Sequence, residues 1–436
     1  MSKWTETTWG TITTLEEVID IQNGYAFKSE DFDAEGIPVI KIKNIASGKL
    51  LLDDVQFYSK PLIGLDKFIV SKNDILIAMT GSHVTQISSA VGKVTKYDST
   101  QKSLLNQRVG KIYSVNINKL NNDFLYYFLI QPTTQYQLGL KASGSANQAN
   151  ISPSNIKELP ILLPSIKEQK QIIYVLSCLD SKIENLRRQN ETLEAIAQTL
   201  FKHWFIDFEF PDADGKPYKS SGGEMIASKL GEIPKNWKLG TLDDCLSLII
   251  DYRGKTPLKL GSDWTSEGIP ALSAKNIKNG KILVENLINF VDESLYKKWM
   301  KDELAKGDIL LTSEAPLGEV YYLASDRKYV LSQRLFALRV NSKCSSPYVY
   351  FWLRSPQGQH LLNRRATGST VQGIRQSELR KVEIIIPEET ILTKASNLWM
   401  SILEKIESNY QQIETLTKTR DALLPKLMSG QLRIEE

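Results

Sequence analysis

Three features of the chain hold residue types that occur in catalytic sites. Gly254-Lys255-Thr256 ends like a phosphate-binding loop, but that motif needs a glycine five residues before Gly254, where the chain has Ile249. Residues 211–216, PDADGK, crowd their acids onto one short turn, whereas metal-assisted cleavage needs acids from separate elements. No HExxH spacing links the three histidines, His83, His203 and His360. We therefore expect no catalytic site, cofactor site or metal site on this chain.

The composition is that of an ordinary folded protein long enough for two domains or more. The chain has 436 residues, of which 42% are hydrophobic and 24% charged, and its formal net charge is +4. Its three cysteines, Cys178, Cys245 and Cys344, lie far apart, and their odd number argues against a disulfide scaffold. No signal peptide and no membrane-length apolar run is found. We therefore expect a soluble protein of a reducing cytoplasm, without membrane contact.

Short apolar runs predict a β-rich first domain. Strands are expected at 37–42, 74–79, 109–115 and 159–164. Residues 121–131, NNDFLYYFLIQ, predict a helix capped by Asn or Asp, and the polar stretch 143–155 predicts a loop. Gly, Pro, Asp and Ser after residue 210 predict a linker.

The second half of the chain repeats the first half in the same order. EGIPVIKIKNIASGKL (35–50) returns as EGIPALSAKNIKNGKI (267–282), and KNDILIAMTG (72–81) returns as KGDILLTSEA (306–315). Gln107-Arg108 returns as Gln333-Arg334, and the stretch 143–164 returns as 367–387. Because several matched segments keep their order, we infer an internal duplication.

Each half is followed by a stretch with the period of a coiled coil. Apolar residues recur every 3.5 positions, which keeps them on one stripe of a helix. The first seam includes Leu179, Ile183, Leu186, Asn190 and Leu193. The second seam includes Trp399, Ile402, Ile406, Asn409, Ile413 and Leu416. A single Asn in a seam usually fixes register and partner at some cost in stability.

The order domain, helix, domain, helix makes the two helices antiparallel if they pair with each other. The register that sets Ile183 beside Leu416 also sets Asn190 opposite Asn409, which gives each buried amide a partner. Arg420 is then the poorest fit, because it faces Leu179, and we expect its side chain to extend to solvent.

These features predict an α+β fold: two homologous β-rich α/β globular domains at opposite ends of a long intramolecular antiparallel coiled coil, as a pseudo-two-fold internal repeat. The expected segments are a first domain at 1–164, a spacer helix at 165–210, a linker at 211–228, a second domain at 229–387, and a second helix with the C-terminal tail at 388–436.

Length and charge are compatible with binding to duplex DNA. About 28 helical residues at roughly 1.5 Å each span on the order of 40 Å, near the roughly 34–36 Å of one DNA turn. Residues 229–387 hold 24 Lys and Arg against 17 Asp and Glu, whereas residues 1–164 hold 16 against 15. Solvated surface explains the first domain's charge equally well. The strongest basic cluster is Arg364, Arg365, Arg375, Arg380 and Lys381.

Several local features recur in a fixed order. They include Gly24-Tyr25-Ala26-Phe27, Lys43-Asn44, Gly307-Asp308-Ile309-Leu310, and the endings LFKHWFIDFE and LLPKLMSGQLRI. With this order, the chain resembles, over essentially its whole length, the specificity (S) subunit of type I restriction–modification enzymes.

The resemblance implies a non-catalytic, sequence-specific subunit with two target recognition domains. Each domain would recognise one half of a bipartite, gapped target in double-stranded DNA, and the helices would set the gap. The implied partners are two methyltransferase (M) subunits, which carry S-adenosylmethionine and methylate adenine, and restriction (R) subunits, which carry ATP-driven translocase and nuclease activity; ATP and Mg are expected on these partner subunits. The outer faces of the helices would dock M subunits, with Trp204, Phe205 and Phe208 as candidates. Packing against a globular domain explains these three aromatic residues equally well.

Polar residues in loops between strands are the candidates for DNA contact, because a rigid sheet can present them to a groove. Arg suits guanine O6 and N7, Asn and Gln suit adenine, and Lys suits phosphate. The first-domain candidates are Tyr25, Lys28, Lys43, Asn44, Ser82, His83, Gln107, Arg108, Asn147 and Gln148. The second-domain candidates are Tyr252, Arg253, Lys255, Lys275, Asn276, Ser313, Glu314, Gln333, Arg334, Thr370, Gln372 and Arg375. Each alone could be a turn-capping or solvated side chain, and residues that recur in both halves could equally be structural.

Two other classes stay open. A coiled-coil protein-interaction scaffold with two β-rich binding domains and no DNA specificity would have the same architecture. The recognition half of a self-contained restriction–methylation enzyme is opposed by the absence of an NPPY-type methyltransferase motif, unless the chain is a fragment.

Overall fold

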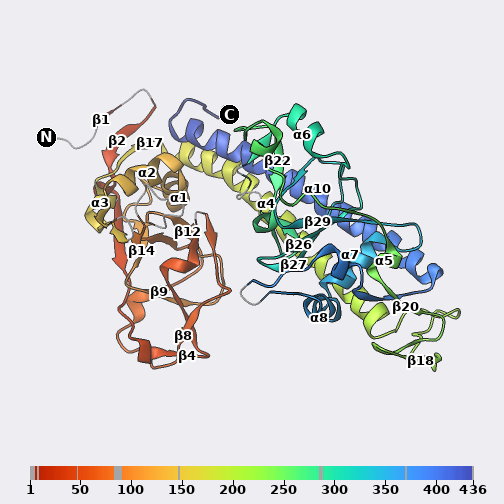
Figure 1. Ribbon diagram of the computed structural model, residues 1–436. Coiled ribbons are helices and arrows are strands. Elements are labelled where there is room, and N and C mark those ends of the chain that lie inside the picture. Colours follow the sequence, from red (N-terminus) through yellow and green to blue (C-terminus); the bar gives the residue numbers. More distant parts are fainter. Residues whose placement is uncertain are drawn as a thin grey trace. The chain divides into compact units, whose positions relative to one another are not determined.

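Two long helices and two globular parts make up the structure (Figure 1). Contacts divide it into unit 1, residues 1–184 with 414–436, and unit 2, residues 185–413. The computed structural model describes residues 5–6, 9–46, 48–82, 91–145, 148–283, 287, 289–368 and 371–434. Each unit contains one globular part and a segment of both long helices.

The core of unit 1 is a four-stranded antiparallel sheet in the order β12-β10-β14-β3. Its strands are β3 (Ile19–Asn23), β10 (Ile75–Ala78), β12 (Val94–Lys96) and β14 (Val109–Ser114). Ile75 and Ile77 pack in a cluster with residues of α1 (Asn122–Ile130), and Leu76 and Ala78 pack in a second cluster. Because successive side chains point to opposite faces, the continuous apolar run ILIA forms a strand buried on both sides.

A second sheet contributes the other cluster, in the order β4-β8-β5-β13-β9, with β5 and β13 parallel. Its strands are β4 (Phe32–Asp33), β5 (Ile37–Ile40), β8 (Gln56–Tyr58), β9 (Ile69–Val70) and β13 (Ser103–Leu105). The remaining strands are β1 (Thr5–Glu6), β2 (Thr11–Thr14), β6 (Ile45–Ala46), β7 (Lys49–Leu50), β11 (Thr80–Gly81), β15 (Ser143–Ser145), β16 (Gln148–Asn150) and β17 (Pro160–Leu163). The helices α2 (Pro132–Leu140) and α3 (Pro153–Lys157) complete this globular part.

Unit 2 repeats the strand order of the main sheet of unit 1. Its main sheet has the order β21-β29-β26-β27, formed by β21 (Leu246–Ile250), β26 (Ile309–Ser313), β27 (Leu317–Tyr322) and β29 (Leu335–Val340). The smaller sheet again has one parallel pair, in β25 (Phe290–Val291), β22 (Ile269–Leu272) and β28 (Val330–Leu331). The helices α7 (Ser346–Arg354), α8 (Pro356–Arg364) and α9 (Gln376–Leu379) follow as α1, α2 and α3 do in unit 1. The shared topology agrees with the predicted duplication.

Two further strand pairs of unit 2 have counterparts in unit 1. The pair β20 (Lys238–Thr241) and β30 (Glu383–Ile386) corresponds to β2 with β17, and the hairpin β23 (Ile277–Lys278) with β24 (Lys281–Ile282) corresponds to β6 with β7. Unit 2 also contains the hairpin β18 (Met225–Ser228) with β19 (Gly231–Pro234) and the helices α5 (Leu242–Cys245) and α6 (Glu293–Trp299). The predicted linker 211–228 therefore ends in a β-strand, because Met225–Ser228 pairs with the strand that follows it.

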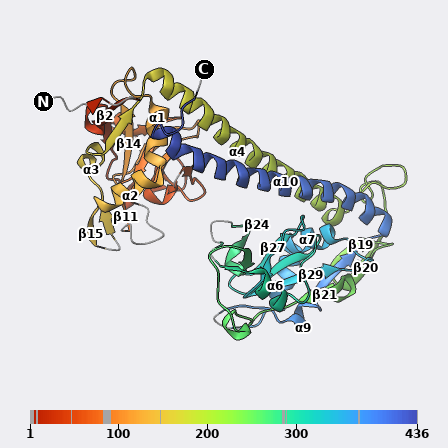
Figure 2. The ribbon, with the colours of Figure 1, turned by 90° about the horizontal axis from the view of Figure 1, so that it is seen from above.

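Two long helices, α4 (Ile166–Phe201) and α10 (Glu389–Met428), lie side by side (Figures 1 and 2). In unit 2, Trp399 Nε1 donates a hydrogen bond to the carbonyl oxygen of Ala197, at 3.2 Å. In unit 1, Arg420 Nη1 lies 2.9 Å from Asp180 Oδ1. A second contact in each unit gives the direction: Asn190 bonds to Asn409 in unit 2, and Glu168 pairs with Arg433, just beyond the end of α10, in unit 1. In both units residue numbers fall along one helix as they rise along the other, so the helix segments within each unit are antiparallel.

The seam residues are buried or half-buried in both helices. Asn409 Nδ2 donates to Asn190 Oδ1 at 2.8 Å, and Asn190 Nδ2 donates to the carbonyl oxygen of Ile406 at 3.3 Å. This is the pairing that the heptad register predicts. An amide inside an apolar seam is costly unless it is hydrogen-bonded, so the Asn pair favours this one alignment.

Arg420 differs from the prediction that its side chain extends to solvent. Its guanidinium is half-buried and pairs with Asp180 and Asp421, and Asp180 also accepts a hydrogen bond from the hydroxyl of Tyr127 at 2.7 Å. Burial lowers the pKa of Arg420, but these two carboxylates raise it by more, so the pKa lies above its usual value. Charge pairing, rather than snorkelling, accommodates this residue.

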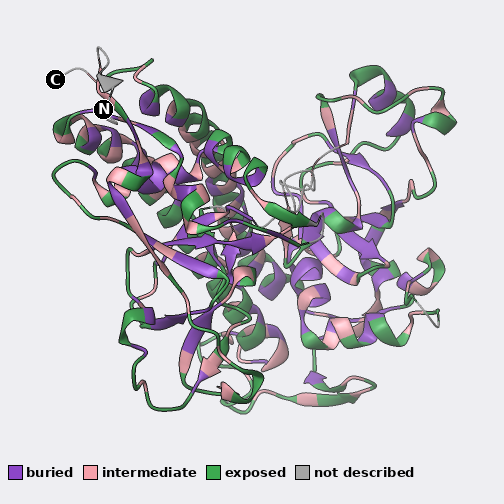
Figure 3. Ribbon diagram, turned by 90° about the vertical axis from the view of Figure 1, so that its left-hand side faces the viewer, coloured by how far each residue is buried: buried purple, intermediate pink, exposed green. Residues whose placement is uncertain are grey.

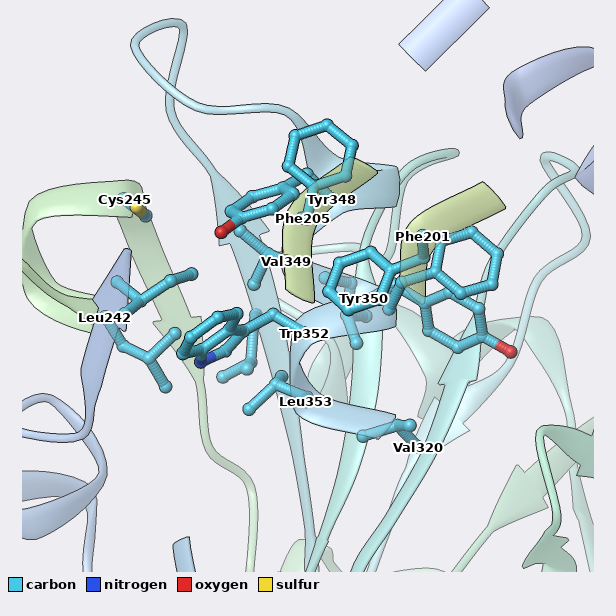
Figure 4. Packing of buried hydrophobic residues seen from close by; sticks show 14 of the residues in the cluster. Phe201, Phe205, Leu242, Cys245, Val320, Tyr348, Val349, Tyr350, Trp352 and Leu353 are labelled. Atoms are coloured by element: carbon cyan, nitrogen blue, oxygen red, sulfur yellow. The ribbon is translucent and has the colours of Figure 1, made fainter. Parts of the chain in front are cut away.

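Aromatic side chains join the end of α4 to the globular part of unit 2 (Figure 4). Phe205 is fully buried and packs against Tyr348, Trp237 and Trp399, with ring centroids 5.1–5.6 Å apart. Phe208 is buried in the same cluster, and Trp204 packs on it. This packing accounts for the aromatic residues of LFKHWFIDFE, so Phe205 and Phe208 are not part of an exposed docking face.

Burial is concentrated in the strands, and loops are mostly exposed (Figure 3).

One further expectation was wrong, and the cysteines make a bond that the sequence did not predict. The stretch 143–155 is not a plain loop, because β15 and β16 pair in it and α3 begins at Pro153. Cys245 and Cys344 form a disulfide, a single bond that is compatible with the argument against a disulfide scaffold. The two cysteines are 99 residues apart in sequence, so only the fold brings them together.

Candidate nucleic-acid interface

The main sheet of unit 2 brings separate polar segments to one edge. Ile250, at the end of β21, is paired with Ala337 of β29, and Leu335 at the start of β29 is paired with Thr312 near the end of β26. Because neighbouring strands are antiparallel, the chain leaves β21, enters β29 and leaves β26 at the same edge. We call these turns the loop edge of unit 2: residues 251–256, 332–334 and 314–316.

Unit 1 has the equivalent loop edge, residues 24–28, 106–108 and 80–82. Asn23 of β3 is paired with Gly110, and Val109 at the start of β14 is paired with Ala78 of β10. A glycine at position 24 lets the chain pass close to the backbone of Asn106, because a Cβ there would lie 2.1 Å from the carbonyl oxygen of Asn106. Tyr25 then pairs with Asn106 and stays partly exposed. The topology therefore gathers Tyr25, Gln107 and Arg108, as it gathers Tyr252, Gln333 and Arg334.

Most of the predicted contact residues are exposed. Exposed in unit 1 are Tyr25, Lys28, Lys43, Gln107, Arg108 and Gln148, and exposed in unit 2 are Arg253, Lys275, Gln333, Arg334, Gln372 and Arg375. Half-buried are Ser82, Tyr252, Lys255 and Glu314. His83, Asn147 and Thr370 lie outside the described residues.

Asn44 and Asn276 are placed differently from the other candidates, since each is only 2% exposed. Asn44 Oδ1 accepts a hydrogen bond from the backbone N–H of Lys41, and its Nδ2 donates to the carbonyl oxygens of Leu51 and Asp54. Asn276 Oδ1 accepts from the backbone and side chain of Ser273. Both amides brace the turn after a buried strand, so their recurrence in the two halves reflects a structural role.

Ser313 is also buried, contrary to its prediction as a DNA contact. Its side chain is 1% exposed at the end of β26, while its backbone N–H donates to the carbonyl oxygen of Arg334. A buried hydroxyl cannot contact a base at the protein surface, so Ser313 is not a base contact, and only its backbone links the two strands at the loop edge.

The turn after β21 is held by contacts of its own side chains. Arg253 makes a two-point ion pair with Asp251, at 2.8 Å for each bond, and lies over the ring of Phe336. Lys255 Nζ donates to the carbonyl oxygen of Trp299 at 2.7 Å, and burial lowers the pKa of this lysine. These contacts order the turn and leave Arg253 on the surface.

The basic cluster expected at 364–381 is largely neutralised. Arg365 pairs with Glu383 at 2.8 Å, Arg380 pairs with Asp243, and Lys381 pairs with Glu378 at 2.8 Å. Counting charges along the sequence missed these partners, because Asp243 lies 137 residues from Arg380. The cluster is therefore not a uniform phosphate-binding patch.

Arg334 and Glu314 form an exposed ion pair at the loop edge of unit 2. Arg334 Nε lies 3.2 Å from Glu314 Oε1. The equivalent positions in unit 1 are Arg108 and Thr80, and Thr80 Oγ1 donates to Asn150 Oδ1 at 2.7 Å. Sequence reasoning missed Thr80 and Asn150, although the alignment of 72–81 with 306–315 pairs Thr80 with Glu314.

The acidic segment PDADGK, residues 211–216, is an ordinary turn. Asp212 Oδ1 accepts hydrogen bonds from the backbone N–H groups of Asp214 and Lys216, which makes PDADGK a self-capped turn. Among the described residues, no three His, Cys, Asp or Glu side chains are grouped so that they could hold a metal ion. None of the described helices is long and apolar enough to cross a membrane.

Comparison with known proteins agrees with the duplication. The family model described as type I restriction modification DNA specificity domain matches residues 7–195 and again residues 234–418. The type I restriction enzyme MjaIX specificity subunit of Methanocaldococcus jannaschii is 32% identical over 317 residues, which cover 72% of this chain and 70% of that protein. The HindI specificity subunit of Haemophilus influenzae is 24% identical, covering 92% of this chain and 96% of that protein.

A solved structure shares the fold. The crystal structure of the S subunit of a type I restriction-modification system from M. genitalium superposes with a TM-score of 0.60, covering 97% of both chains at 18% sequence identity. The two matches of the family model place the chain in the family of type I restriction modification DNA specificity domains, with two copies of that domain.

Proposed function

We propose that this chain is the DNA-sequence-reading subunit of a type I restriction–modification complex. The observation that carries the proposal is the pair of loop edges: one scaffold occurs twice, and each copy presents polar side chains from separate turns of one sheet. Exposed Arg, Gln and Lys side chains on rigid turns suit base edges and phosphates.

In this proposal each domain binds one half of a bipartite, gapped target. The two domains would lie at opposite ends of the antiparallel helices, and the helices would set the gap. The different side chains at equivalent positions, such as Glu314 and Thr80, fit two domains that recognise different half-sites.

The chemistry would lie on partner subunits. Two M subunits would bind S-adenosylmethionine and methylate adenine, and R subunits would use ATP and Mg to translocate and cut DNA. Apolar side chains on the outer faces of the helices suit docking of M subunits; Tyr174 is 71% exposed, Ile196 51% and Leu398 50%. The chain itself would be non-catalytic and would act in the cytoplasm.

Methylome sequencing of the host with and without this gene tests the proposal. The expected result is loss of one two-part, gapped adenine-methylation motif when the gene is deleted, and its return when the gene is restored. An unchanged methylome, in a strain whose M subunit is shown to be expressed and active, would contradict the proposal and favour a protein-interaction scaffold.

A further inference from the structure

The loop edges of the two units differ most clearly at one pair of positions. In unit 2 the side chains of Arg334 and Glu314 are 52% and 42% exposed and form an ion pair. In unit 1 the repeat places Arg108 and Thr80 there, and Thr80 is hydrogen-bonded to Asn150. An ion pair this exposed contributes little to stability, so stability alone does not account for it.

The backbone holds Arg334 in a conformation that favours glycine. Its φ is +63°, in the left-handed region that residues with a Cβ seldom adopt. Hydrogen bonds on both sides fix it there: the carbonyl oxygen of Arg334 accepts from Ser313, and that of Gln333 accepts from Ala274. Glycine would fit this turn with less strain, so a large charged side chain at this position points to a use for that side chain.

Glu314 is positioned by a different segment. Its backbone pairs with Gly373, and the N–H of Ile374 donates to the carbonyl oxygen of Ser313 at 2.9 Å. A Cβ on Gly373 would lie 3.1 Å from the Cβ of Glu314 and 3.4 Å from its Oε2. The Glu314 side chain therefore lies directly against this turn, with Arg334 on a neighbouring turn.

A guanidinium next to a carboxylate matches the major-groove edge of one G·C base pair. Guanine presents two acceptors, O6 and N7, and cytosine presents one donor, the N4 amino group. We propose that Arg334 donates to guanine O6 and N7 while Glu314 accepts from cytosine N4, so that the two residues together read one G·C pair in the half-site bound by unit 2. This inference rests on the proposed function.

Competition binding by the complex of this chain with its M subunit tests the proposal. The target duplex is the motif found by methylome sequencing, with each base pair of both half-sites substituted in turn. Arg334→Ala should weaken binding of the target about 5- to 150-fold and remove discrimination at one G·C pair only. Glu314→Gln, which adds a donor that thymine O4 accepts, should reduce discrimination between G·C and A·T at that same pair.

Arg108→Ala is the matched control, and it should affect the other half-site only. Thermal unfolding of each variant shows whether the fold is kept. Equal loss on all duplexes with a smaller salt dependence would make Arg334 a phosphate contact and overturn the proposal. An unchanged profile for Glu314→Gln would also overturn it. If the unsubstituted complex binds all duplexes equally, the proposed function itself fails.

Discussion

Asn44 and Asn276 occupy equivalent positions in the two halves, and their identity has a structural cause. Both are buried and brace the same turn. Glu314 and Thr80, by contrast, occupy equivalent positions with different side chains and different partners. Domains that bind different half-sites must differ at some of the positions that contact bases, whereas a polar residue that is both shared and buried belongs to the scaffold.

Replacing Asn44 with Ala should therefore lower stability without altering base preference. The substitution leaves the carbonyl oxygens of Leu51 and Asp54 and the N–H of Lys41 without this partner, which should cost about 1–3 kcal/mol in the free energy of unfolding, measured by urea denaturation. Gln107→Ala, at an exposed position, is the control and should stay within about 0.5 kcal/mol. Altered preference at one base pair with unchanged stability would instead make Asn44 a base contact.

Among the predicted contact residues, the sequence locates the turns at the strand ends better than it predicts which side chains in those turns are exposed. Strand ends and the repeat locate the loop edges, because these depend on local apolar patterns. Whether a side chain is buried or paired depends on segments far away. Ser313 is buried by the fold, and Arg380 pairs with an aspartate 137 residues earlier. Neither property follows from local sequence.

At the scale of elements, the long helices were the most predictable part. The spacer helix was expected from residue 165, and α4 begins at Ile166. The heptad pattern also gives the register of Asn190 against Asn409, because only one alignment buries apolar rows and pairs both amides. The hairpin of β15 and β16 was not predictable, because its residues are polar and the pairing is made by the backbone.

The Asn pair should act as one unit in stability. Asn190→Leu leaves Asn409 buried without its side-chain partner and should lower the free energy of unfolding by about 1–3 kcal/mol. The double change Asn190→Leu with Asn409→Leu should recover that loss, because two apolar residues suit the seam. Urea denaturation measures both.

The matched control is Gln189→Leu, on the exposed side of the same helix, which should change stability little. If the double variant loses as much free energy of unfolding as the single variant, or more, the two amides stabilise the protein by more than their hydrogen bond to each other. The pairing would then not explain why asparagine occupies both positions.

At the scale of the whole molecule, the chain is two copies of one scaffold with different side chains at the loop edges. Arg108 belongs to unit 1 and Arg334 to unit 2. If each unit binds its own half-site, a change in one loop edge alters one half of the target only. Free energies of binding lost in the two units should then be independent.

The double variant Arg108→Ala with Arg334→Ala tests this independence. Its loss of binding free energy should equal the sum of the two single losses within about 0.5 kcal/mol, measured by competition binding of the complex with its M subunit. The double variant Arg334→Ala with Glu314→Ala is the comparison within one unit. Because these two residues form an ion pair, their losses of binding free energy should not add. Coupling above about 1 kcal/mol between Arg108 and Arg334 would mean that the half-sites are not read separately, as when both contacts depend on one shared deformation of the DNA.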